Sequence, residues 1–355
     1  MRFSYLDGIR GMAALFVLAR HWDELFRFHF QQSHLAVDLF FMLSGFVIAH
    51  AYDDKLGSGR MGPGEFMRLR FARLYPVYAL SVVICGAYFI AGTVARAEPN
   101  LVVLEWLLAI ALALCFLPYS VNGSPAMYSV NICFWSLALE MLVNVLYAYT
   151  RQHLGKRLLT VVVSVAGVLL IVVALATNTL GHGYLRGWPS FFGGFLRAVF
   201  GIGLGLLLYR HRTRLQRWTW NLPAWFSFPL LAVLMVTPSP PGYGWLVHLV
   251  AVFVVLPFAI IVAASEEPTR AWHARVLEVL GVASYPLYLM HVPFGHIVRK
   301  SAAFVHGWER PLAAAMTVLL FYLCLQLDKR FDAPVRTWLR MRLRGGGAVR
   351  AVSLG

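Results

Sequence analysis

Residues 9–22 read IRGMAALFVLARHW, an apolar run that suits a membrane-spanning helix yet contains Arg10 and His21. A separation of eleven residues makes roughly three helical turns, so both side chains should lie on one face of the helix. They would be about 16 Å apart along the axis, more than half the thickness of the hydrocarbon core. Because ionisable residues are costly there, the pair predicts a functional site. The alternative is an arginine that snorkels to the interface and a histidine with a structural hydrogen bond.

The composition is that of a polytopic membrane protein. Of the 355 residues, 59% are hydrophobic and only 13% are charged, against about 25% charged residues in soluble domains. The net charge of +15 would suit nucleic acid, but the arginines cluster in short segments between apolar runs, as topology signals do, and no nucleic-acid partner is expected. The four cysteines lie in apolar stretches without a Cys-x-x-Cys pair, which predicts packing roles and no metal.

Apolar segments long enough to span a membrane, or nearly so, recur along the whole chain. About 20 residues are needed to cross, so 101–118 and 222–237 are marginal. The predicted segments are 9–30, 35–52, 72–94, 101–118, 132–149, 158–178, 189–209, 222–237, 243–264, 276–299 and 311–328.

The basic segments orient these spans. Lysine and arginine concentrate in 55–73, 151–157, 210–217 and the tail from Lys329, which the positive-inside rule places in the cytoplasm. An even number of crossings must then separate the first two basic segments, although three apolar segments intervene. The short segment 101–118, which contains Glu105, is therefore expected not to span.

The sequence thus predicts an all-α transmembrane bundle of about ten spans with both termini cytoplasmic. Residues 1–344 should form one membrane domain. Residues 345–355, a Gly-containing basic stretch, are predicted to be a disordered cytoplasmic tail.

Several further polar residues interrupt the apolar segments. Asp38 needs a cationic partner, and Ser44 with Gly45 allows a close helix approach. Arg70 and Arg73, three residues apart at a helix entrance, could hold phosphates, or they could be ordinary cytoplasmic anchors.

A second group lies later in the chain. Glu140 is a candidate to orient His21 or Arg10 or to act as a base, and Asn144 continues its polar stripe. Trp135 could stack on a sugar or could be an interfacial belt residue. Arg197, well inside an apolar segment, needs an anion from protein or ligand.

Five stretches together resemble the acyltransferase-three family of integral-membrane O-acyltransferases. They are LDGIRG (6–11) with His21, VDLFFMLSG (37–45), Arg70-x-x-Arg73, WSLxxE (135–140) and SYxxYLxHxP (284–293). Pro286 departs from the residues that the family often has at that place. For His291 a structural role is favoured.

The resemblance implies a bacterial inner-membrane, multi-pass enzyme without a fused extracytoplasmic hydrolase domain. It would move an acyl group, acetyl being expected first, from cytoplasmic acyl-CoA to a hydroxyl of an exported or lipid-linked glycan. Arg10 and His21 would be the essential pair, with His21 as base or transient acyl carrier. Arg70, Arg73 and Arg197 are assigned to the acyl donor, and Asp38, Ser44, Trp135, Asn144 and His291 support the site.

Two other classes stay open at this point. Polar residues at membrane depth also mark transport paths, so a transporter or flippase for a glycan or an anionic solute is the main alternative. A structural subunit of a polysaccharide assembly machine is the third. Acyl-CoA turnover abolished by His21→Ala would separate the enzyme from both.

Overall fold

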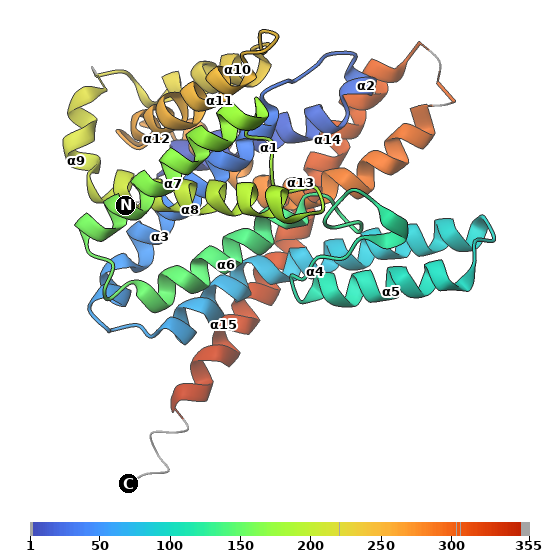
Figure 1. Ribbon diagram of the computed structural model, residues 1–355, viewed down its shortest axis with the longest axis horizontal. Helices are drawn as coiled ribbons and strands as arrows, with labels where there is room; N and C mark the ends of the chain where they lie inside the picture. The colour runs from blue at the N-terminus through green and yellow to red at the C-terminus, as the bar shows by residue number, and fades with distance from the viewer. Residues whose placement is uncertain (1–2, 220, 303, 306, 349–355) are drawn as a thin grey trace.

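The computed structural model describes residues 3–348 except 220, 303 and 306, and these residues form an all-α bundle without strands (Figure 1). The predicted fold class is confirmed. The main helices are α1 (Ser4–His21), α3 (Ala36–Gly57), α4 (Pro63–Ala95), α5 (Asn100–Leu114), α6 (Phe134–Thr150), α7 (Lys156–Thr177), α8 (Trp188–Arg210), α10 (Ser227–Val236), α11 (Gly244–Val250), α12 (Leu256–Ala263), α13 (Ala271–Ala302), α14 (Glu309–Leu327) and α15 (Ala333–Ala348).

Seven helical segments of the described chain are long and apolar enough to cross a membrane. Helix α1 fails this criterion because its 18 residues include Asp7, Arg10 and Arg20, and α6 fails because it has 17 residues. The figure of about ten spans therefore stays a prediction. The seven are Ser33–Gly57, Pro63–Ala95, Lys156–Thr177, Trp188–Arg210, Gly244–Ala263, Ala271–Ala302 and Glu309–Arg342.

The segment expected not to span forms a short helix. Helix α5 has 15 residues and packs beside α4 (Figure 1), and at 1.5 Å per residue it is about 22 Å long, less than the hydrocarbon core. Glu105 accepts a hydrogen bond from the Asn122 backbone N–H at 2.7 Å, in the connection that follows the helix. This geometry is compatible with a helix that does not cross the membrane.

Two close helix pairs form the core of the bundle. Helix α1 packs lengthwise on α13, and α3 packs on α8. A Cβ at Gly45 would lie 2.0 Å from the Ile202 carbonyl oxygen, and one at Gly205 would lie 2.0 Å from that of Met42. Only glycine allows this α3–α8 approach, as expected for Ser44-Gly45.

Helix α1 ends earlier than the predicted segment 9–30. It stops at His21, and α2 (Asp23–Phe26) and the left-handed Arg27 (φ 50°) follow. Buried Trp22 fixes this end, since its Nε1 donates to the His291 carbonyl at 3.2 Å. His21 therefore lies in the last turn of α1, not in the middle of a longer helix.

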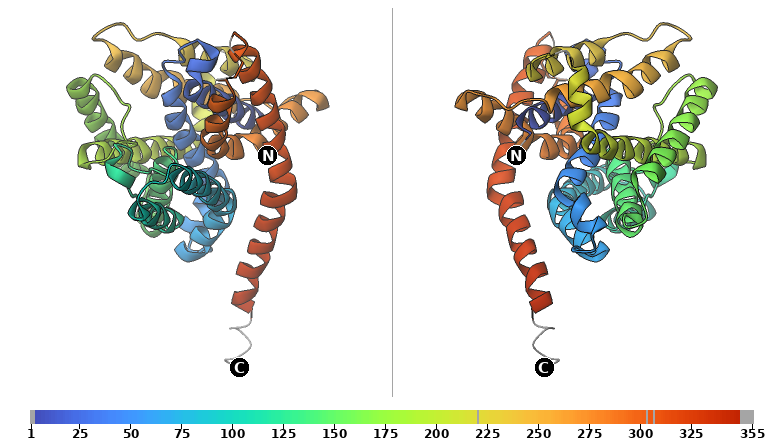
Figure 2. Two further views of the ribbon diagram at one scale, coloured as in Figure 1. Left: turned by 90° about the vertical axis from the view of Figure 1, so that its right-hand side faces the viewer. Right: turned by 90° about the vertical axis from the view of Figure 1, so that its left-hand side faces the viewer.

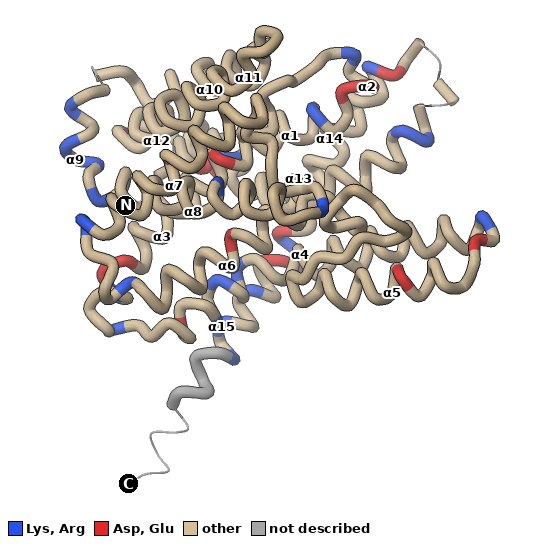
Figure 3. The backbone as a smooth tube through the Cα atoms, viewed as in Figure 1, with Lys and Arg blue, Asp and Glu red and all other residues tan. Residues whose placement is uncertain are grey.

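The C-terminal helix leaves the bundle. A π-helical turn, Asp328–Asp332, joins α14 to α15, which contacts α4 and then extends away from the bundle toward its C-terminal end (Figure 2). Helix α15 reaches Ala348 and so passes the predicted start of a disordered tail at 345. The rest of that predicted tail, 349–355, lies outside the described residues. Lysine and arginine are frequent along α9 (Arg212–Leu215) and α15 and sparse within the bundle (Figure 3).

Candidate active site

Polar residues from α1, α3, α4, α6 and α13 line a cavity of about 140 Å³, here called the Arg10 cavity. Its cations are Arg10, Arg70 and Arg73, and its carboxylate is Glu140. Three guanidinium groups with one carboxylate leave a net positive charge, which suits an anionic ligand. The remaining polar lining residues are Ser44, Ser136, Ser284, Tyr285 and Tyr288.

Arg10 is fixed by the last of the five sequence stretches. Its Nε donates to Ser284 Oγ at 2.9 Å, and its Nη2 donates to the Gly281 carbonyl at 3.1 Å. Asp7, one turn away on α1, forms an ion pair with the same Nη2 at 3.0 Å. The α1 and α13 stretches therefore form one side of the cavity.

Arg70 forms the opposite side with Glu140 and Ser44. Its Nη2 forms an ion pair with Glu140 and donates to Ser44 Oγ at 3.1 Å. The Ser44 hydroxyl donates to Glu140 Oε1 at 2.6 Å. Glu140 was predicted to orient His21 or Arg10 or to act as a base, and in the structure its ion pair is with Arg70 and not with His21 or Arg10. The reason is its position on α6, about 7.5 Å along the axis from Trp135, which lines the cavity that holds His21.

A second cavity of about 460 Å³, the His21 cavity, lies beyond the first. Its lining includes His21, Cys133 and Trp135. Val37 and Tyr288 line both cavities, so they form the boundary between them. The Tyr288 hydroxyl is held at that boundary by a 2.7 Å hydrogen bond with Ser136.

His21 contacts His291 at the edge of this cavity. His21 Nδ1 lies 2.9 Å from the Val17 carbonyl oxygen and 3.2 Å from His291 Nε2. His291 Nδ1 lies 3.1 Å from the Leu287 carbonyl oxygen. Because a carbonyl oxygen can only accept, Nδ1 of each ring carries the proton. Nε2 of His291 then accepts from His21, and Nε2 of His21 keeps a lone pair.

Arg197 does not lie with Arg70 and Arg73. It lines the His21 cavity, where its Nε and Nη2 donate to the two Asp38 oxygens at 3.0 and 2.7 Å. Both side chains are 2% exposed. Asp38 is thus the anion that Arg197 needs, and Arg197, predicted with Arg70 and Arg73 for the acyl donor, lies in a different cavity from them. The guanidinium also lies over the Trp135 ring, 5.3 Å from its centre.

The loop before α8 adds a further contact to Arg197. Its Nη1 donates to the His182 carbonyl at 2.7 Å. Desolvation lowers the pKa of the His182 imidazole, and the positive charge of Arg197 lowers it further. His182 is therefore expected to be neutral around pH 7.

Asn144 lies outside both cavities. It is fully buried, and neither amide atom forms a hydrogen bond with the described residues. The predicted polar stripe from Glu140 therefore does not continue along the site.

Sequence reasoning gave no role to Tyr288 or Ser284, although both lie in a quoted stretch, and it predicted only a packing role for Cys133. A third cavity of about 170 Å³ beside Arg10 and Arg73 is lined by Asp328, Asp332 and Arg336 of the C-terminal region. No sequence pattern linked that region to the site.

The apolar helices and the charged cavities between them define a multi-pass membrane protein with a buried polar site. A family model described as "Acyltransferase domain" matches residues 3–327. The chain therefore belongs to this acyltransferase family, the acyltransferase-three family, and is an acyltransferase.

Its curated relatives come from bacteria. The chain is 41% identical to "Protein 2 in picA locus" of Rhizobium radiobacter over 49% of this chain and 95% of that protein. It is 34% identical to "Exopolysaccharide production protein ExoZ" of Rhizobium meliloti (strain 1021), over 34% of this chain and 35% of that one. It is also 34% identical to "Acyltransferase MdmB" of Streptomyces mycarofaciens, over 28% of this chain and 27% of that one. The chain thus spans only about a third of the exopolysaccharide protein and about a quarter of the Streptomyces acyltransferase. No solved structure gives a significant match.

Proposed function

We propose that this protein transfers an acyl group from cytoplasmic acyl-CoA to a hydroxyl of an exported glycan, and that this acyl group is acetyl. The observation that carries this proposal is the pair of cavities that meet at Val37 and Tyr288, one with Arg10 and the other with His21. Two substrates with different chemistry can reach such a boundary from opposite sides. The name of the exopolysaccharide relative supports a glycan acceptor.

The Arg10 cavity suits the donor. Arg10, Arg70 and Arg73 offer guanidinium groups for the phosphates of CoA, which bind such groups through paired, charge-assisted hydrogen bonds. Ser284, Gly281 and Glu140 hold two of these arginines before the donor arrives. We assign this end to the cytoplasmic side, in agreement with the basic segments 55–73, 151–157 and 210–217.

The His21 cavity suits the acceptor. The lone pair of His21 Nε2 removes the proton from the acceptor hydroxyl as its oxygen attacks the thioester carbonyl. The carbon–sulfur bond then breaks, and the CoA sulfur leaves and takes the proton from His21. His291 accepts the Nδ1–H of His21 and so orients the ring and stabilises its charged form.

The test uses purified protein in lipid nanodiscs with acetyl-CoA. Free thiol should appear only when acceptor glycan is present, and mass spectrometry should show one added acetyl group on the glycan. His21→Ala should lower transfer roughly 100- to 10,000-fold, the usual contribution of a general base. Glycan or anion flux that needs no acyl-CoA would contradict the proposal and favour a transporter.

A further inference from the structure

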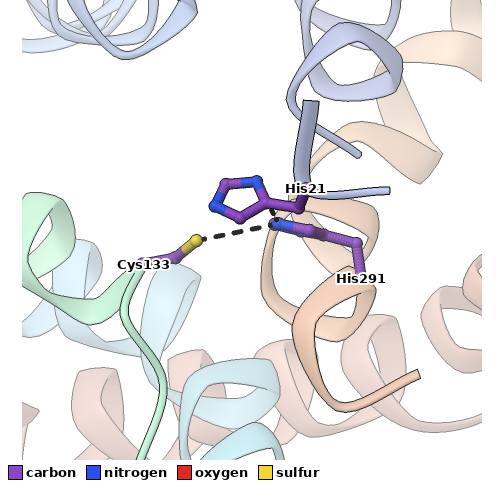
Figure 4. Close-up of side chains that lie close together, drawn as sticks. All are labelled: His21, Cys133 and His291. Atoms are coloured by element: carbon purple, nitrogen blue, oxygen red, sulfur yellow. Dashed lines mark hydrogen bonds between the residues drawn. The ribbon is translucent and has the colours of Figure 1, made fainter. Parts of the chain in front are cut away.

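Three metal-ligating side chains converge at the edge of the His21 cavity. His21 ends α1, Cys133 precedes α6 and His291 lies within α13 (Figure 4). One ligand atom from each lies within 4.8 Å of the others. His291 Nε2 lies 3.2 Å from His21 Nδ1 and 3.8 Å from Cys133 Sγ. His291 and Cys133 are almost fully buried, and His21 is partly exposed to the cavity.

The two distances measured from His291 Nε2 match those of a tetrahedral zinc site. Zinc binds imidazole nitrogen at about 2.0–2.1 Å and thiolate sulfur at about 2.3 Å. Two ligands of one tetrahedral ion are then roughly 3.3–3.6 Å apart, close to the separations seen around His291. Two imidazoles and a thiolate form a borderline-soft donor set that favours zinc over magnesium or calcium.

The surroundings of His291 also suit a ligand. Its Nδ1–H donates to the Leu287 carbonyl at 3.1 Å, the kind of support that fixes the ring of a metal-binding histidine. That bond leaves the Nε2 lone pair directed at His21 and Cys133. The fourth coordination position would face the His21 cavity, where Asp23 contributes negative charge and water can enter.

We propose that His21, Cys133 and His291 bind one zinc ion, with release of the Cys133 thiol proton and a shift of the His21 proton from Nδ1 to Nε2, and that this ion inhibits the enzyme. This inhibitory role rests on the proposed function. The ion takes the Nε2 lone pair of His291, which the hydrogen bond from His21 also needs, so the two states exclude each other. The ion also holds His21 in a position where it is no longer a free base.

Zinc binding is measured first, without reference to activity. Purified protein is treated with EDTA, dialysed against zinc chloride and analysed by inductively coupled plasma mass spectrometry. We expect one zinc ion per chain and, with Cys133→Ser, a loss of affinity on the order of 100-fold. Cys324→Ser, which changes a buried cysteine in α14, is the matched control and should bind as the unaltered protein does. Cobalt should show a thiolate charge-transfer band that Cys133→Ser abolishes.

Inhibition is measured second, as acetyl transfer against zinc concentration. With each rate taken relative to the same variant's rate without zinc, Cys133→Ser should resist zinc, whereas Cys324→Ser should stay as sensitive as the unaltered protein. Absence of stoichiometric zinc, or equal binding by Cys133→Ser, would overturn the site. Zinc binding that leaves transfer unchanged would overturn the inhibitory role. If zinc binds as expected but no acyl transfer is found with or without zinc, the proposed function fails and the site stands.

Discussion

The Arg10 cavity and the His21 cavity differ in how they hold their charges. In the Arg10 cavity Arg10 pairs with Asp7, both partly exposed, Arg70 pairs with Glu140, and Arg73 is a third cation in the lining. In the His21 cavity the deepest arginine is closed off, since Arg197 and Asp38 are each 2% exposed and bind each other through two hydrogen bonds, while Arg20 is exposed at the cavity edge. The first arrangement leaves positive charge for a ligand, and the second uses its charge to hold helices together.

The largest expected effect is a loss of stability when the buried ion pair between Asp38 and Arg197 is broken. Asp38→Ala leaves Arg197 as an unpaired charge between α3 and α8, which should lower the free energy of unfolding by about 3–5 kcal/mol. Thermal unfolding in detergent measures this. The double variant Asp38→Ala, Arg197→Met should recover much of the loss, because no charge is left unpaired. An unchanged melting temperature for the single variant would show that the Asp38–Arg197 pair does not stabilise the fold, and the difference between the two cavities would not hold.

An intermediate effect is expected in the Arg10 cavity. Arg73→Gln removes a guanidinium that lines it, and a lost hydrogen bond to a charged group costs about 1.5–3 kcal/mol. The KM for acyl-CoA should therefore rise roughly 10- to 150-fold, while the melting temperature stays close to that of the unaltered protein. Steady-state kinetics at saturating acceptor measures this change. A fall in stability with an unchanged KM would mean that Arg73 is a structural cation.

The smallest expected effect tests whether Tyr288 lies at the boundary between the two cavities. Tyr288→Phe removes the hydrogen bond with Ser136, worth about 1 kcal/mol, at the point where both cavities meet. It should change the KM values of donor and acceptor alike, by about fivefold. Tyr285→Phe is the control, because Tyr285 lines the Arg10 cavity and not the His21 cavity. An equal change of both KM values in the control would show that Tyr288 is not the boundary.

The sequence predicted much of the fold, because membrane helices are apolar and their positions follow from hydropathy. It also predicted that Arg10 and His21 share a helix face, and both contact α13. The sequence did not predict which charged residues form ion pairs with each other. Glu140 binds Arg70 and Asp38 binds Arg197, and such pairings depend on how α3, α4, α6 and α8 rotate against one another.

Cys133 illustrates the same limit. Its apolar surroundings in the sequence predicted packing alone, yet its sulfur lies 3.8 Å from His291 Nε2. The two residues are far apart in the sequence, so no local spacing of cysteine and histidine could reveal the contact. The end of α1 was also missed, because the buried Trp22 that fixes it needs a partner on α13.

The most direct test of the account measures CoA binding and acyl transfer in the same two variants, His21→Ala and Arg73→Gln. Isothermal titration of CoA into nanodisc-embedded protein gives binding, and mass spectrometry of the glycan gives transfer. The account predicts that His21→Ala binds CoA as tightly as the unaltered protein but transfers the acyl group roughly 100- to 10,000-fold more slowly, whereas Arg73→Gln binds CoA weakly. Loss of CoA binding in His21→Ala, or full transfer by it, would contradict the division of the site into a donor cavity and a catalytic cavity.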